Sequence, residues 1–349
     1  MDSPLWGLTE EELFSLPPRL CRQARQEIFM KKVVVFGGGT GLSCLLSGLK
    51  LFPLDVTTII TVSDNGSSTG VLKEELDIPA VGDIGKVLLS MANVDKDFVD
   101  LLRYRFSREG SLHNHPVRNI MLAALIDIKG SLTEATEYMA RLLQVKGTVL
   151  PLTEEKVELV GESEEGRFYG EESVSQNISH IKRLSYDHEV HVADTIRERI
   201  READLVIFSP GSLYTSILPH LITEDIVNAL ETAKAPLMYI SNLVTQPGET
   251  DGYNVGDHVK VLNRYLKGRT IDVVIANNGM VEERIRKKYL DTEGKEVVRL
   301  TGIEDLPGMQ VIASDIFSIQ EEKIRHNELR TAYLVFSYLM DRGDVGPVR

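Results

Sequence analysis

Short runs of β-branched residues alternate with helical apolar stripes along most of this chain, beginning at Lys32. The first run covers residues 33–36 and the second residues 57–62, and four leucines between residues 42 and 49 recur at the spacing of one helix face. Continuous apolar runs of this kind are typical of strands that are buried on both faces and joined by crossover helices. The pattern therefore predicts an α/β fold with a mostly parallel sheet and helices on both faces.

Two long segments interrupt this alternation. Residues 86–143 have an almost wholly helical pattern and predict a helical insertion, whereas residues 146–192 alternate like strands and predict a small antiparallel β excursion. The α/β alternation then resumes. The expected elements are a helix at 194–202, strands at 205–208, 236–240, 271–276, 297–300 and 311–313, and a closing helix at about 327–340.

The two ends of the chain differ from its middle. Residues 1–29 are expected to be an N-terminal extension that adds little to the fold, because no sustained apolar stripe precedes Arg19. One domain then covers residues 30–327, and residues 328–349 form a C-terminal helix and tail.

Charge and composition exclude several classes of protein. With 52 acidic and 39 basic residues the formal net charge is −13, which argues against nucleic-acid binding because such surfaces neutralise phosphates with Lys and Arg. No apolar run approaches the roughly 20 residues that a membrane span needs, and the first residues do not resemble a secretory signal. The two cysteines, Cys21 and Cys44, have no metal-ligand spacing. We therefore expect a cytoplasmic protein.

The first predicted strand ends in a glycine-rich loop made of Gly37, Gly38, Gly39, Thr40 and Gly41. Glycine lets backbone amides come close to a phosphate while the chain turns into a helix, so the loop predicts a phosphate cradle. It lacks the lysine of a Walker loop. It also fails the dinucleotide fingerprint, because the third glycine would fall at Leu42 or Cys44. A tight turn between strand and helix is the plainer alternative.

A polar loop, residues 63–70, follows the second strand at the same expected edge of the sheet. Its Asp64 and Asn65 are candidates for a pocket wall, and Asp64 suits a ribose hydroxyl, a divalent metal or a reacting hydroxyl. A solvated Asx turn would use the same residues. Further along, Asp83 precedes an apolar helix, and its spacing predicts a helix N-cap.

The second half of the chain repeats this arrangement after the strand at 205–208. Hydroxyls and amides there would meet at a helix N-terminus, where the helix dipole favours an anion. The candidate ligand-binding residues are Ser209, Gly211, Ser212, Leu213, Tyr214 and Thr215. Ser212 would serve equally as a helix cap. Because all three loops follow buried strands, we expect them to converge on one crevice at the carboxyl ends of parallel strands.

Two further polar segments are candidates for the walls of that crevice. One follows the strand that ends at Ile240 and contributes Asn242, Thr245, Gln246 and Glu249. The other precedes an apolar helix and contributes His115 and Asn119. A histidine at such a place is more often structural than catalytic. The sequence has no nucleophile elbow, catalytic-triad order or zinc motif.

Four of these motifs together resemble those of a known family. They read VVVFGGGTG from Val33, TVSDNGSSTG from Thr61, PGSLYTS from Pro210 and TQPGETDGY from Thr245. They are similar to the motifs of the YvcK-type gluconeogenesis factors, which belong to a CofD-like family that includes the 2-phospho-lactate transferases. The resemblance extends over residues 30–327.

The resemblance implies a Rossmann-like fold and a nucleotide or nucleotide-sugar ligand such as a UDP-sugar. It also implies a cytoplasmic role in carbon use, cell shape and envelope synthesis. In the transferase branch two acidic residues bind a divalent metal, and Asp64 and Asp83 occupy the matching positions here. Arg325 and His326 resemble an Arg-His pair of the family, in which Arg325 would contact a phosphate as a fork of donors.

Three stretches depart from the family's pattern. The second loop, usually DNGGSSG, continues after Asp64 as NGSSTG. The stretch expected as GDIRN has Gly85 and Lys86 at its end, and the stretch expected as GHxxGN has Asn114 and Arg118 in place of its glycines. These departures affect a catalytic role more than ligand binding.

Three functions are therefore compared. The leading one is a regulatory protein that binds a nucleotide sugar. The alternative is a Mg²⁺-dependent transferase, which would move a phosphate-bearing group from a nucleotide donor to a hydroxyl acceptor through Asp64 and Asp83. The third, a nicotinamide-dependent oxidoreductase with a dinucleotide ligand, is disfavoured by the failed fingerprint. A homo-oligomer is compatible with all three.

Overall fold

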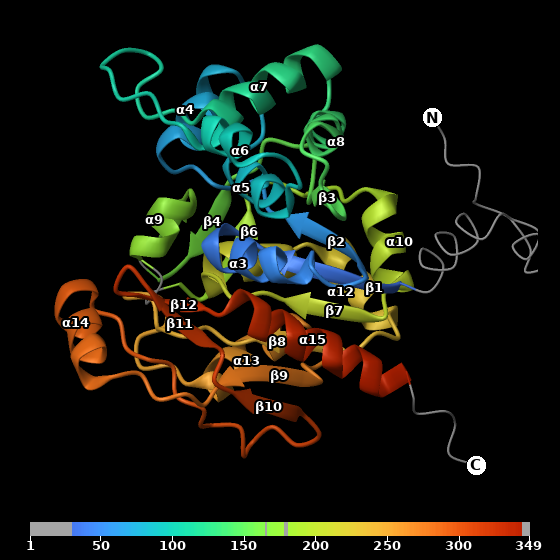
Figure 1. The fold of residues 1–349 in the computed structure, drawn as a ribbon, viewed down its shortest axis with the longest axis vertical. Helices are drawn as coiled ribbons and strands as arrows, with labels where there is room; N and C mark the ends of the chain where they lie inside the picture. The colour runs from blue at the N-terminus through green and yellow to red at the C-terminus, as the bar shows by residue number, and fades with distance from the viewer. Residues whose placement is uncertain (1–29, 165, 178–180, 344–349) are drawn as a thin grey trace, which may run out of the picture.

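A computed structural model describes residues 30–164, 166–177 and 181–343 (Figure 1). The prediction that residues 1–29 add little to the fold lies outside the described residues, as does the expected tail at 344–349.

A seven-stranded sheet runs through the centre of the molecule, and every neighbouring pair of its strands is parallel. The strand order is β10-β9-β8-β7-β1-β2-β3. The strands are β1 (Lys31–Gly37), β2 (Leu54–Ile60), β3 (Thr148–Pro151), β7 (Leu205–Phe208), β8 (Leu237–Ile240), β9 (Val273–Asn277) and β10 (Gln310–Ser314). The order reverses between β1 and β7, and such a switch point opens a crevice at the carboxyl ends of the strands.

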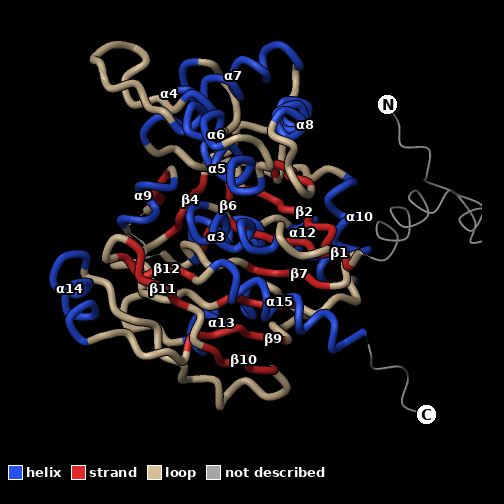
Figure 2. The backbone as a smooth tube through the Cα atoms, viewed as in Figure 1, coloured by secondary structure: helices blue, strands red, loops and turns tan. Residues whose placement is uncertain are grey.

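Helices cover both faces of this sheet, as predicted (Figure 2). Successive residues of β1 alternate between two cores: Val33 and Val35 face one, Val34 and Phe36 the other. The first core is closed by α3 (Gly39–Leu49), α5 (Gly82–Met91) and α15 (Glu328–Gly343). The second is closed by α10 (Asp194–Glu202), α11 (Leu218–Leu221), α12 (Glu224–Thr232) and α13 (Val255–Tyr265).

The predicted helical insertion is present beyond the β2 side of the sheet (Figure 1). After α4 (Ser67–Glu75) and α5 it comprises α6 (Lys96–Arg103), α7 (Val117–Lys129) and α8 (Leu132–Leu142). The β excursion is an antiparallel sheet of β4 (Leu159–Glu162), β5 (Arg167–Tyr169) and β6 (Arg183–Tyr186), with α9 (Glu171–Gln176) between its strands. The fold class is therefore confirmed.

Part of the segment assigned to the excursion belongs elsewhere. β3 pairs in parallel with β2 and is an edge strand of the main sheet, so the excursion is shorter than the predicted 146–192. The strand has only four residues, too few for its pattern to separate it from the antiparallel strands that follow.

Two other predictions differ from the structure. The apolar run at 297–300 is not a strand: it makes a single bridge, Val244 to Val297, and lies across the loop after β8. The hairpin of β11 (Phe317–Gln320) and β12 (Lys323–His326) was not predicted, because its turn places Glu321 and Glu322 at φ of 49° and 59°. Hairpin turns of this kind are normally signalled by Asn or Gly.

The last elements complete the described chain. A π-helical turn, η2 (Leu213–Ile217), leads into α11, and α14 (Glu283–Glu293) lies between β9 and β10 in the sequence. Across the described ranges, no helix combines the length and the apolar character that a bilayer crossing requires.

Candidate functional site

The first loop, residues 37–41, and the third loop, residues 209–215, meet at the switch point between β1 and β7. A Cβ atom on Gly41 would collide with the carbonyl oxygen of Pro210, and one on Gly37 would collide with the Ser209 hydroxyl. The two loops therefore approach backbone to backbone, which glycine at position 41 makes possible. Gly39 and Gly211 lie at the same edge of the sheet, as the convergence of these loops requires.

A cavity of about 260 Å³ opens where these loops meet, and we call it the switch-point cavity. It is lined by residues 38–41 and Cys44, by 210–212 and Ser216, by 242–246, and by Lys295, Ile324, Arg325 and His326. The structure thus brings together the first glycine loop, part of the third loop, the segment after β8 and the Arg-His pair. The loop at 63–70 does not line this cavity.

The N-terminus of α3 supplies the donors of the switch-point cavity. First-turn amides of a helix have no partner within it. The Gly39 N–H donates to Oδ2 of Asp83 over 2.9 Å, which leaves the amides of Thr40 and Gly41 at the cavity edge. Gly39 has a φ of 68°, and a Cβ there would meet no atom within 4 Å. A side chain at position 39 would therefore be strained and would project into open space.

The third loop, in contrast, already holds an anion of the protein itself. Glu249 is buried, and its carboxylate accepts the Ser212 hydroxyl at 2.8 Å and the Tyr214 N–H at 3.1 Å. Asn242 Oδ1 accepts the Gly211 N–H at 3.2 Å, and Ser212 Oγ caps the Thr215 N–H at 3.1 Å. The donors that we predicted for a ligand phosphate are thus largely engaged within the chain.

This arrangement also explains where the predicted residues of the third loop lie. Gly211 and Ser212 line the switch-point cavity, whereas Leu213 and Ser209 are fully buried. Of the predicted wall, Asn242, Thr245, Gln246 and Arg325 line the cavity, and Glu249 stands behind the third loop. Burial raises the pKa of Glu249, and the hydrogen bonds from Tyr214 and Ser212 oppose that rise.

Asp64 lies in a different environment. Its Oδ1 accepts the Gly66 N–H at 2.9 Å, which is the Asx turn that the sequence offered as an alternative. Burial raises the pKa of Asp64, and the nearby Asp83 charge adds to the shift.

The N-cap prediction for Asp83 is wrong. Helix α5 begins at Gly82 with Val81 in the N-cap position, so Asp83 falls inside the first turn. Its carboxylate accepts the Gly39 N–H through one oxygen and pairs with Nζ of Lys86 at 2.7 Å through the other. Asp83 is thus a bridge between α5 and the first glycine loop.

These carboxylates do not fit Mg²⁺ as they are arranged. The ammonium of Lys86 already occupies the side of Asp83 that a metal would use, so Mg²⁺ would have to displace it. Among residues 30–343, omitting the undescribed positions, no three or more His, Cys, Asp and Glu side chains form a group that could hold a metal ion.

The remaining predicted wall residues make contacts within the protein, and two of them, His115 and Asn119, are buried and contact the same hydroxyl. His115 Nδ1 lies 2.8 Å from the Ser68 hydroxyl, and Asn119 Nδ2 donates to the same oxygen over 3.3 Å. Asn65 Oδ1 accepts the Glu172 N–H at 3.1 Å and ties its loop to α9. His115, Asn119 and Asn65 do not line the switch-point cavity.

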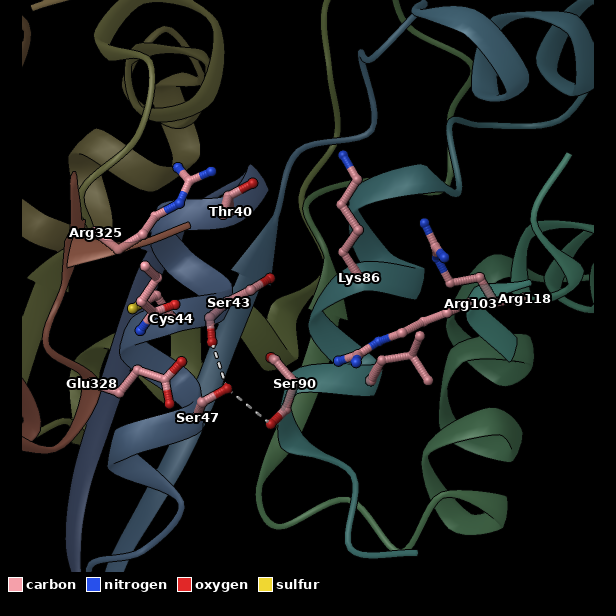
Figure 3. Close-up of a pocket in the computed structure, with 12 residues that line it drawn as sticks. Thr40, Ser43, Cys44, Ser47, Lys86, Ser90, Arg103, Arg118, Arg325 and Glu328 are labelled. Atoms are coloured by element: carbon pink, nitrogen blue, oxygen red, sulfur yellow. Dashed lines mark hydrogen bonds between the residues drawn. The ribbon is translucent and has the colours of Figure 1, made fainter. Parts of the chain in front are cut away.

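A second cavity, of about 420 Å³, adjoins the first and shares Thr40, Cys44 and Arg325 with it (Figure 3). We call it the basic cavity. Its other lining residues are Ser43, Ser47, Lys86, Leu89, Ser90, Arg103, Arg118, Gln320 and Glu328. Burial raises the pKa of the Cys44 thiol to about 12, so this side chain is neutral at physiological pH.

The basic cavity accounts for two of the departures in the sequence. A Cβ atom on Gly85 would lie 3.1 Å from Cδ and 3.4 Å from Nε of Arg118, so the arginine side chain passes directly over this glycine. Gly85 and Arg118 are therefore a single spatial feature. The two residues are 33 positions apart in the sequence, so the motifs alone present them as two separate departures.

Comparison with known proteins agrees with the motifs. The family described as 2-phospho-L-lactate transferase CofD matches residues 33–317. The gluconeogenesis factor of Bacillus subtilis (strain 168) is 40% identical over 315 residues, 89% of this chain and 98% of that protein. That of Listeria monocytogenes is 36% identical over 310 residues, 88% and 95% of the two chains.

The fold has a solved counterpart. A crystal structure of a member of the UPF0052 family from Bacillus halodurans superposes with a TM-score of 0.83 at 35% identity. The superposition covers 87% of this chain and 99% of that one.

Proposed function

This chain belongs to the CofD family and to the gluconeogenesis factors within it, and we propose that it is a regulatory protein that binds a nucleotide sugar or a related nucleotide. In this proposal the ligand's phosphates occupy the switch-point cavity. The cellular role would be in carbon metabolism, cell shape and envelope synthesis, in the cytoplasm.

The observation that carries this proposal is the pairing of donors across the switch-point cavity. The amides of Thr40 and Gly41 lie on one side, at the positive end of the α3 dipole, and the Arg325 guanidinium lies on another. A helix N-terminus and an arginine fork are both suited to phosphate oxygens. Lys295 also lines the cavity, with its ammonium paired to Glu293 at 2.7 Å.

The ion pair of Asp83 and Lys86 favours binding over turnover. A metal-dependent transfer needs carboxylates that are open to the metal, but Asp83 is engaged by the Gly39 amide and the Lys86 ammonium. A binding protein needs only the phosphate donors. The transferase remains the second candidate, because the family's description names that activity and Asp64 and Asp83 lie close enough for their charges to interact.

Isothermal titration calorimetry tests the proposal. We expect saturable binding of UDP-N-acetylglucosamine or UDP-glucose that persists in EDTA, and weaker binding of the free sugars. Arg325→Gln should reduce the affinity at least about tenfold, since it removes a charged fork. Arg201→Gln, an exposed change of the same kind on α10, is the control and should bind normally.

The same samples separate binding from transfer. After long incubation with Mg²⁺, chromatography should recover the nucleotide sugar unchanged. Metal-dependent consumption of the nucleotide with a hydroxyl acceptor would instead establish the transferase. Failure to bind any nucleotide, nucleotide sugar or dinucleotide in a folded sample would overturn the proposal itself.

The proposed cellular role has its own test. A Bacillus subtilis strain that lacks its gluconeogenesis factor can be complemented with this chain or with its Arg325→Gln variant. We expect the unaltered chain to restore growth on gluconeogenic carbon sources and normal cell shape, and the variant to fail at equal expression. Full restoration by the variant would separate the cellular role from the cavity.

A further inference from the structure

We propose that the basic cavity is a second anion-binding site, built around Arg118, which takes the phosphate group of a phosphorylated small molecule. This inference goes beyond the nucleotide site and does not rest on it, because its principal residues lie outside the switch-point cavity.

Arg118 is a buried cation without an ion-pair partner, and Asp83, the carboxylate whose charge acts on it, is already paired with Lys86. The residue is 6% exposed, and its Nε is buried with no hydrogen-bond partner. Among the described residues, no ion pair or hydrogen bond between side chains engages its guanidinium. Arginine side chains are rarely this buried unless they are paired, because removing the charge from water is costly. The guanidinium lines the basic cavity, so a ligand in that cavity would supply the missing partner (Figure 3).

Neighbouring cations make the unpaired charge of Arg118 still less favourable. Arg103 and Lys86 line the same cavity, and Arg325 enters from the opposite wall (Figure 3). Burial and the repulsion of Arg105 and Arg103 lower the pKa of Arg118 to about 10. Such repulsion among cations is relieved by an anion between them.

The lining has one carboxylate among its described residues, and it does not neutralise Arg118. That carboxylate belongs to Glu328, which lies beside α3 with Arg325 on the wall opposite Arg103 and Arg118 (Figure 3). Asp83, outside the lining, pairs with Lys86. With Lys86 paired to Asp83, three arginines face the single carboxylate of Glu328, which leaves the cavity positive in a chain whose net charge is −13.

The number of donors makes a phosphate a better occupant than a carboxylate. Cationic side chains and the Thr40 hydroxyl supply these donors, whereas the hydroxyls of Ser43, Ser47 and Ser90 already donate to backbone carbonyl oxygens. A phosphate offers at least three acceptor oxygens, which match several guanidinium donors and one hydroxyl at once. A carboxylate offers two. The volume of about 420 Å³ leaves room for the small organic group that carries the phosphate.

Calorimetric titration of the full chain with inorganic phosphate, at constant ionic strength in chloride, tests this inference. We expect saturable binding that is at least about tenfold tighter than that of malonate, a dicarboxylate of similar charge. Glycerol 3-phosphate should bind at least as well as inorganic phosphate. Equal binding of malonate and phosphate would overturn the assignment to a phosphate, and no binding of either would overturn the site.

Variants then locate the site. Arg118→Gln and, separately, Arg103→Gln should each weaken phosphate binding about tenfold or more, and Arg118→Lys should recover part of the loss. Arg201→Gln on α10 is the matched control and should bind phosphate like the unaltered chain. Circular dichroism establishes that each variant is folded. Unchanged phosphate affinity in folded Arg118→Gln and Arg103→Gln would contradict the proposal.

A last arm separates this site from the nucleotide site. With the switch-point cavity saturated by UDP-glucose, phosphate should still bind and should still depend on Arg118. Complete competition between the two ligands would show one site rather than two. If no nucleotide binds but phosphate does, the proposed function fails and this inference stands.

Discussion

The two glycine loops at the switch point look alike in sequence but differ in what holds them. The first loop, residues 37–41, turns its helix N-terminus toward a cavity with the amides of Thr40 and Gly41 available. The third loop, residues 209–215, has a carboxylate of the protein, Glu249, where a ligand phosphate was expected. A loop after a buried strand therefore gains a binding role only when no side chain of the same fold has taken its donors.

The largest expected effect comes from removing that internal anion. Glu249→Ala would leave the Ser212 hydroxyl and the Tyr214 amide without an acceptor in a buried place. We expect the free energy of unfolding to fall by about 3 kcal/mol. Urea denaturation measures this change. A loss below about 1 kcal/mol would show that the third loop does not depend on Glu249, and the comparison of the loops would fail.

The second prediction contrasts two glycines of the first loop. Gly41→Ala would push its methyl group into the Pro210 carbonyl, so it should separate the loops and cost about 2 kcal/mol of stability. Gly39→Ala has open space and should cost about 1 kcal/mol through its positive φ alone. Thermal unfolding should rank them in that order, and calorimetry should find nucleotide binding weakened in both.

The third prediction sharpens the difference between the glycine loops and the loop at 63–70. Asp64→Asn should change nucleotide affinity less than about threefold, because Asp64 holds an Asx turn and does not line the switch-point cavity. Calorimetry with UDP-glucose measures this. A tenfold loss would place Asp64 at the ligand.

The smallest expected effect concerns pH. Burial, with the nearby charges of Asp64 and Asp83, raises the pKa of Glu171 from 4.5 to about 8. As the pH rises, the unfolded chain therefore loses the Glu171 proton at a lower pH than the folded chain does. The contribution of Glu171 to the free energy of unfolding decreases as the pH rises from about 4.5 to 8. Burial lowers the pKa values of His220 and His326 from 6.5 to about 4. These two histidines therefore change the free energy of unfolding mainly below pH 6.5.

The window from pH 6.5 to 8 lies above the titration of these histidines, but burial also raises the pKa values of Asp64 and Glu249, so the Glu171→Gln variant assigns the change to Glu171. We expect the melting temperature to fall modestly across it and the Glu171→Gln variant to show a flatter profile. A profile that rises with pH in the unaltered chain and is unaffected by the substitution would contradict this assignment.

Much of the fold followed from the sequence because its signals are local. The runs at 33–36 and 205–208 lie within β1 and β7 because consecutive β-branched and aromatic residues suit a strand buried on both faces. The leucines of α3 are buried as their helical spacing required. The glycine loops were found by the same local reasoning.

The rest depended on contacts between distant positions. Glu249 binds Ser212 across 37 residues, and nothing in the run TQPGETDGY shows which loop its carboxylate will reach. The hairpin turn at Glu321 and Glu322 gives no glycine signal. The sequence shows Arg118 only as a departure from a motif, because its position in the cavity depends on its packing over Gly85.

Arg325 lines both cavities, so binding in one cavity is coupled to binding in the other. A single guanidinium cannot give its full set of donors to two anions at once, so an occupant of either cavity changes the free energy of filling the other. Thermodynamic reciprocity makes the two changes equal, whichever ligand arrives first. Because the shared guanidinium makes this coupling unfavourable, two ligands in the proposed sites would oppose each other, and the occupancy of each cavity would follow the ratio of the two ligand concentrations.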